Sequence, residues 1–140
     1  DFADVVLEAY QYNECKGLLK NHRIIVLKTK TYFMSLEYSK DSTVIINAAE
    51  SVAKLLEGIV NCKVRKHYWT GLEKVPFTVK HFMSFARRFA TEKKFNRFTH
   101  NNKTFVNFIW ESIDETFFKY RLRFILEPSL IWNPREISVQ

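Results

Sequence analysis

The sequence predicts a single α+β domain: a small sheet of short strands packs on a helical cluster, and a long helix follows near the C-terminus. Short segments rich in β-branched residues come first, and apolar residues recur at helical spacing in the second half of the chain. The 140 residues include only 3 Gly and 3 Pro, and no linker or repeat divides them. A domain of this length buries about two-thirds of the surface of its unfolded chain. We divide it into a core over 2–98 and a C-terminal helical extension with a tail over 99–140.

The first third of the chain predicts short strands and turns. β-Branched residues favour a strand in "ADVVLEAY", and a turn with a short returning segment would complete a hairpin over 3–20. After Asn21 the apolar spacing predicts two short helical turns, with strand as the alternative because the β-branched residues favour it. The predicted elements are a strand at 3–10, a turn at 13–17, a strand at 18–20, helical turns at 23–29 and 31–36, and a strand at 44–46.

The middle and end of the chain predict helices. Asn47 is placed to cap a helix with Glu50 completing a capping box, and the apolar spacing Val52, Leu55, Leu56, Ile59 continues it. Residues 61–75 have no clear period and end in a loop. Thr78 caps the next helix, whose apolar face is Phe82, Phe85, Ala86 and Phe89. A shorter basic helix is expected at 92–98, and a long one from Thr104 to Glu127 carries the stripe Phe105, Phe108, Ile109, Ile113, Phe117, Tyr120 and Phe124. The last ten residues, 131–140, are expected to form an extended tail.

The sequence carries no motif of a known catalytic or cofactor site. It has no GxSxG, Walker-type glycine loop, GxGxxG or HExxH, so we predict neither an enzyme nor a bound cofactor. Cys15, Cys62 and four scattered histidines do not match the spacing of a zinc site, so no metal is expected. Two free thiols favour a reducing compartment, the nucleus or the cytoplasm. No apolar run approaches the roughly 20 residues of a membrane span.

The positive charge is concentrated in one segment. Residues 61–100 hold ten basic residues against Glu73 and Glu92, a balance of 10 − 2 = +8 in a chain of net charge +7. Such a segment is typical of a nucleic-acid or acidic partner, or of a solvated face. Its candidate binding residues are Lys63, Arg65, Lys66, Arg87, Arg88, Lys93, Lys94 and Arg97.

Several motifs in residues 2–98 resemble the BTB/POZ domain family. They are the opening Phe2-x-Asp4 with Val5 and Val6, the pair His22-Arg23 before an aliphatic cluster, and Tyr32-Phe33. A strand and a helix with a Leu-Leu pair follow over 44–59. The resemblance implies a non-catalytic protein–protein interaction module, an adaptor or scaffold that self-associates or recruits a partner. It also implies a charged pocket formed by Asp4 and Arg23, whose pairing would offset the high cost of burying either charge alone.

The chain departs from the family pattern at two places that concern partners. The hydrophobic-x-Glu pattern of cullin-binding members is not clearly present between Phe33 and Val44, where "SLEYS" (35–39) is a poor substitute. A cullin-type ubiquitin ligase scaffold is therefore left open as a partner. The N-terminal helix that many members exchange in their homodimer has no counterpart before Phe2.

We therefore expect a protein partner, which includes a second copy of the chain. Trp110 and Phe118 lie off the main stripe of the long helix, and Trp132 lies in the tail, so these three are the candidate interface residues. The alternative function is a nucleic-acid- or chromatin-associated factor that uses residues 61–100. For that alternative we expect weak, non-specific binding, and we expect no contact with membranes.

Overall fold

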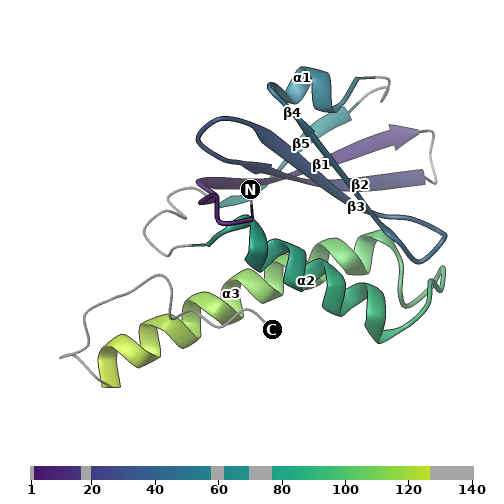
Figure 1. Ribbon diagram of the computed structural model, residues 1–140. Helices are drawn as coiled ribbons and strands as arrows, with labels where there is room; N and C mark the ends of the chain where they lie inside the picture. Colours follow the sequence, from purple (N-terminus) through teal and green to yellow (C-terminus); the bar gives the residue numbers. More distant parts are fainter. Residues whose placement is uncertain (1, 17–19, 58–61, 70–76, 127–140) are drawn as a thin grey trace.

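The chain forms an antiparallel sheet with two long helices packed on one side of it (Figure 1). The computed structural model describes residues 2–16, 20–57, 62–69 and 77–126, without the side chains at 14–16, 20–21, 62–69 and 120–126. The elements are β1 (Glu8–Lys16), β2 (Lys20–Lys28), β3 (Phe33–Tyr38), β4 (Val44–Ala49), α1 (Val52–Leu55), β5 (Cys62–Trp69), α2 (Val79–Glu92) and α3 (Asn102–Leu126). The α+β class is confirmed.

The five strands are arranged in the order β4-β3-β2-β1-β5, and each neighbouring pair is antiparallel. Four consecutive strands therefore form a meander, and β5 returns to pair with β1 at the far side. This order leaves β4 and β5 as the two edge strands. Side chains alternate between the two faces of a sheet, so one face of β2 and β3 presents Ile25, Leu27 and Leu36 to the helices.

The core lies between this face of the sheet and the two long helices. The predicted apolar face of α2 is confirmed, because Phe82, Phe85, Ala86 and Phe89 are all buried. The buried first half of the predicted stripe of α3 is Phe105, Ile109 and Ile113. An aromatic cluster joins the layers: the Phe89 ring stacks on His100 with ring centroids 3.8 Å apart, and the Tyr38 ring meets Phe89 edge-on. Full burial of such side chains contributes about 1.5–3 kcal/mol each.

The prediction of helical turns at 23–29 and 31–36 is wrong. Both segments are strands, β2 and β3, and the alternative left open by their β-branched residues is the correct one. The register explains the error, since Ile24 and Val26 are also buried, on the face opposite to Ile25 and Leu27. A strand with both faces buried has an unbroken apolar run, which periodicity alone does not separate from a helix.

The segments around β4 and β5 also differ from prediction. The strand at 44–46 is confirmed and extends to Ala49, which places Asn47 on β4 instead of at a helix cap. The expected helix is the single turn α1, capped by Ser51, whose Oγ accepts the Lys54 N–H at 3.2 Å. Within residues 61–75, where no periodicity predicted an element, residues 62–69 form β5.

Three further predictions concern the hairpin and the C-terminal part of the chain. The first strand begins later than expected and continues through the predicted turn at 13–17 to Lys16. The separate helix predicted at 92–98 is not formed: α2 ends at Glu92, residues 93–98 are not helical, and Asn96 and His100 pair across a tight bend. The tail at 131–140 lies outside the described residues.

Candidate functional site

The structure separates the predicted Asp4–Arg23 couple, so this prediction is wrong. The cross-strand register pairs Glu8 with Lys28 at one end of the β1–β2 hairpin and Arg23 with Asn13 towards the other. Asp4 lies in the segment before Glu8, at the Glu8–Lys28 end of the hairpin. Arg23 lies five residues from Lys28 along β2, which is about 16 Å at the spacing of residues in a strand. The physical reason is the extended conformation of residues 23–28, which carries Arg23 away from the N-terminal segment.

Asp4 instead bonds to the residue between β2 and β3. The Tyr32 hydroxyl donates to Asp4 Oδ2 at 2.7 Å, and the Asp4 backbone carbonyl accepts the Val79 N–H at 2.9 Å. The Tyr32 hydrogen bond lowers the pKa of the Asp4 carboxyl. Burial, and then the Asp4 carboxylate, raise the pKa of Tyr32 to about 12. These contacts fasten the N-terminal segment to the start of α2 and to the β2–β3 turn.

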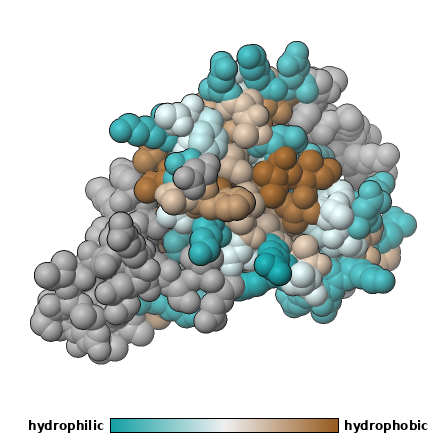
Figure 2. Space-filling model, in the orientation of Figure 1, coloured by the Kyte–Doolittle hydropathy of each residue, from teal (hydrophilic) through white to brown (hydrophobic). Residues whose placement is uncertain are grey.

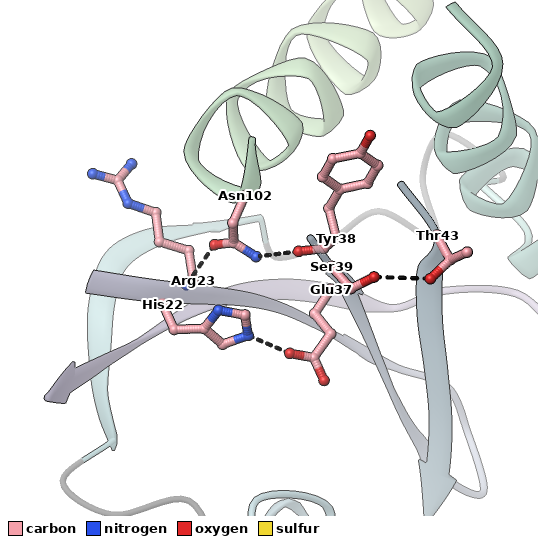
Figure 3. A network of polar contacts seen from close by, with 7 residues as sticks. All are labelled: His22, Arg23, Glu37, Tyr38, Ser39, Thr43 and Asn102. Carbon is pink, nitrogen blue, oxygen red and sulfur yellow. Dashed lines mark hydrogen bonds and ion pairs between the residues drawn. The ribbon is translucent and has the colours of Figure 1, made fainter. Parts of the chain in front are cut away.

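Arg23 belongs to a polar network at the start of α3 (Figure 3). Its backbone N–H donates to Asn102 Oδ1 at 2.6 Å, and Asn102 Nδ2 donates to the Tyr38 carbonyl at 3.3 Å. His22 Nε2 contacts Glu37 Oε2 on the neighbouring strand. The network ties the first residue of α3 to β2 and β3, and its chemistry is that of structural attachment.

Catalytic or metal chemistry finds no support in this network. Over the part of the chain that the structure describes, no group of three His, Cys, Asp or Glu residues is placed to hold a metal ion. Ser39 Oγ, also drawn in Figure 3, forms a hydrogen bond with Thr43 Oγ1 at 2.8 Å across the β3–β4 turn.

The three candidate interface residues have different outcomes. Trp110 is partly buried, and its indole Nε1 donates to Gln11 Oε1 on β1 at 2.8 Å, so it packs α3 against the sheet. Position relative to the helical stripe does not reveal this contact with a distant strand, and a role for Trp110 in an interface stays a prediction. Phe118 is 65% exposed on α3. Trp132 lies outside the described residues.

The basic segment 61–100 is divided between distant parts of the fold. Arg87 and Arg88 lie on α2, while Lys93, Lys94 and Arg97 follow it; all five are exposed. The Phe95 N–H donates to Ser42 Oγ at 2.6 Å, which attaches this part to the β3–β4 turn. Lys63, Arg65 and Lys66 lie on β5, and the structure does not describe their side chains. Four strand spacings, about 19 Å, separate the β4 and β5 edges of the sheet.

The exposed edge of the sheet at β4 is the candidate site that the geometry supports best. Ile45 and Ile46 are 41% and 43% exposed, and they lie on opposite faces of the strand. The six residues "VIINAA" contain no charge and no proline, and their register with β3 runs without interruption from Val44 to Ala49. Edge strands are ordinarily protected by charge, proline or a bulge, because their unpaired backbone groups accept another strand.

The opposite edge has the protections that β4 lacks. The β5 segment "CKVRKHYW" includes three lysine or arginine residues, and its register with β1 shifts between Tyr10 and Tyr12. Charge and a bulge both discourage pairing with a further strand. In the view of Figure 2, hydrophobic surface is exposed on the sheet side of the molecule and is flanked by hydrophilic side chains.

Comparisons with known proteins identify no relative, since no family model, no curated protein and no solved structure matches the chain. None of the helices in the described ranges combines the length and apolar character that a membrane span requires. The strand at 44–46 was predicted from the sequence, but its place at the edge of the sheet was not. The signal that could have found it is the absence of charge in 44–49, beside charged residues at 40, 41 and 50.

Proposed function

We propose that this chain is a non-catalytic protein–protein interaction module that binds its partner by strand addition at β4. The observation that carries the proposal is the unprotected, apolar and regular edge of the sheet, with Ile45 and Ile46 exposed on its two faces. In strand addition, main-chain hydrogen bonds supply affinity and alternate side chains supply specificity. Exposed isoleucines on both faces would give a partner strand apolar contacts above and below the sheet.

The resemblance to BTB/POZ domains supports the same class of function. The more specific proposal is a BTB/POZ-type adaptor or scaffold, with a cullin-type scaffold still open as a partner. The residues that carry the resemblance, His22, Arg23, Tyr32 and Phe33, lie on β2, on β3 and in the turn between them. The implied Asp4–Arg23 pocket is not formed, so the proposal rests on the sheet edge and not on the family.

A pull-down with three baits tests the proposal. Ile46→Pro removes a backbone N–H at the centre of β4, whereas Phe118→Ala removes an exposed ring on α3 and leaves the edge intact. We expect proteins captured from cell extract by the wild-type chain to be lost with Ile46→Pro and kept with Phe118→Ala. Loss of the captured proteins with Phe118→Ala but not with Ile46→Pro would indicate that the partner binds at α3 instead. Identical capture by all three baits, or none above an unrelated control, would contradict both surfaces.

The alternative function, a nucleic-acid- or chromatin-associated factor, has a separate observation in its favour. Two of the exposed arginines lie over phenylalanine rings: the Arg88 guanidinium is 5.3 Å from the Phe108 ring centroid, and that of Arg97 is 5.1 Å from Phe98. Phe98 is 79% exposed. An exposed ring beside an arginine is the combination on which single-stranded nucleic acid stacks.

A further inference from the structure

The backbone of β4 directs a defined set of groups away from the sheet. The Ser39 N–H donates to the Thr43 carbonyl at 2.9 Å, so these two residues form a hydrogen-bonded pair. Hydrogen-bonded and non-hydrogen-bonded pairs alternate along an antiparallel ladder. In the register between β3 and β4, Ile45 and Asn47 then also direct their N–H and C=O groups to β3. The intervening residues direct theirs away from the sheet: Val44, Ile46 and Ala48.

These outward groups are complementary to themselves. They are symmetric about Ile46, so an antiparallel copy of β4 centred there would place Ile46 opposite Ile46 and Val44 opposite Ala48. Three such pairs would make about six main-chain hydrogen bonds. The strand carries no charge that would repel its copy.

The two ends of β4 differ in charge. At its start lie Lys40 and Asp41, and the hydrogen bond from Phe95 to Ser42 brings Lys93 and Lys94 to the same end, for a balance of 3 − 1 = +2. At its other end lie Glu50, Lys54 and Glu57, and the β2–β3 turn, which the Phe33–Ala49 pair places at this end, adds the exposed Lys30, for a balance of 2 − 2 = 0. Antiparallel pairing of two copies brings the basic end of one strand to the neutral end of the other, twice, so the two basic ends do not meet.

We propose that the partner at this edge is a second copy of the chain, joined by antiparallel β4–β4 pairing centred on Ile46. The two five-stranded sheets then continue as one sheet of ten strands about a two-fold axis. This inference rests on the proposed function and names the partner of the same edge. The uncharged strand and the separation of the two basic ends in the antiparallel pairing favour a second copy over a basic strand.

Disulfide trapping tests the register directly. In the proposed pairing Ile45 lies opposite Asn47 of the second copy in a non-hydrogen-bonded pair, with Cα atoms about 4.5 Å apart. That separation is within disulfide range, whereas Ile45 and its own copy are offset to about 7–8 Å. The variants are made in a Cys15→Ser, Cys62→Ser background of the full chain. We expect Ile45→Cys mixed with Asn47→Cys to cross-link under mild oxidation, and either variant alone to remain largely uncross-linked.

Sedimentation of the purified chain tests the association itself. At tens of micromolar we expect a species of twice 16.7 kDa. We expect Ile46→Pro to weaken the dimer about tenfold or more, because it removes an outward N–H. Ile46→Lys, which places two like charges opposite each other, is the second variant should proline disturb folding. A 16.7 kDa species throughout, a dimer insensitive to both variants, or cross-linking of the single-cysteine proteins at the level of the mixture would overturn the inference. A monomer whose capture of another protein is lost with Ile46→Pro would overturn the self-pairing but not the proposed function.

Discussion

The fold alters the ionisation of His81. This residue is 3% exposed at the first turn of α2, and its Nδ1 accepts the Thr78 N–H at 3.0 Å. Since Nδ1 is the acceptor, the neutral ring carries its proton on Nε2, a buried atom without a hydrogen-bond partner among the described residues. Burial, and then the charge of Lys80, lower the pKa of His81 to about 4. The neutral ring is therefore part of the native helix cap.

His81 should make stability depend on pH. Its pKa falls from 6.5 to about 4 on folding, so between these values the unfolded chain binds a proton that the native chain does not. The contribution is complete above pH 6.5 and is lost as pH falls towards 4, by on the order of 3 kcal/mol. His81→Gln keeps an acceptor for Thr78 without titrating. Urea denaturation at several pH values measures the free energy of unfolding, which should fall more between pH 6.5 and 4 for the wild-type chain than for His81→Gln. An equal fall in both proteins would show that His81 is not the cause of the pH dependence.

The Asp4–Tyr32 hydrogen bond offers a test of the corrected pairing. Tyr32→Phe removes the first cause of the lowered Asp4 pKa, so that pKa should rise towards its ordinary value. Arg23→Ala is the matched control, because Arg23 lies far along the hairpin and should leave the Asp4 pKa unchanged. Carboxyl chemical shifts followed by NMR through a pH titration measure both. A rise with Arg23→Ala would restore the couple expected from the sequence.

At the scale of elements, the start of α3 is held by two sets of polar contacts. Asn101 and Thr104 bond reciprocally: the Asn101 N–H donates to Thr104 Oγ1 at 2.8 Å, and the Thr104 N–H donates to Asn101 Oδ1 at 3.0 Å. This is the pattern of a capping box, and it satisfies donors that the first turn of a helix leaves free. Asn102 then connects the helix to β2 and β3. The helix begins where it does because both its cap and its contact with the sheet are at 101–104.

Removal of the Asn102 side chain should destabilise the fold by about 1–2 kcal/mol, because the Arg23 N–H and the Tyr38 carbonyl each lose a partner. Asn107→Ala, an exposed position on the same helix, is the control and should change stability by less than about 0.5 kcal/mol. Chemical denaturation of both variants measures the difference. Equal effects would show that Asn102 acts through helix propensity alone.

At the scale of the whole molecule, charge and apolar surface are arranged separately. The described basic residues of the segment 61–100 lie on β5, on α2 and after it; β5 forms the other edge of the sheet, and the uncharged strand β4 is left exposed. Net charge of +7 keeps copies apart in general, so association requires a surface where that charge does not oppose it. The sheet edge at β4 is such a surface.

The distribution of charge predicts weak, non-specific binding of nucleic acid. Affinity for a labelled single strand should fall steeply with salt, because each phosphate contact releases counterions. Arg87→Glu with Arg88→Glu should weaken binding more than Lys30→Glu with Lys119→Glu, which changes net charge equally at exposed sites outside the segment. Fluorescence anisotropy over a salt series measures both. A sub-micromolar dissociation constant near physiological salt would favour the nucleic-acid alternative over the protein-interaction module.

The sequence by itself determined the elements whose signals are local. The apolar face of α2 and the buried first half of the stripe of α3 follow from 3.6-residue periodicity, and Thr78 marks the start of α2. The α+β class follows from the same signals. A helix makes its hydrogen bonds within itself, so neighbouring residues are enough to predict it.

The tertiary structure alone decided which strands pair, which strand lies at an edge and where Asp4 and Arg23 lie relative to each other. The hydrogen bonds of a strand are made to residues distant in sequence, and β5 reaches β1 across some fifty positions. For that reason the local sequence pattern of residues 23–36 was compatible with both helix and strand, and only the pairing with distant strands distinguishes the two. The free backbone edge of β4 is likewise a property of the sheet order, since its outward N–H and C=O groups would be paired if another strand followed β4.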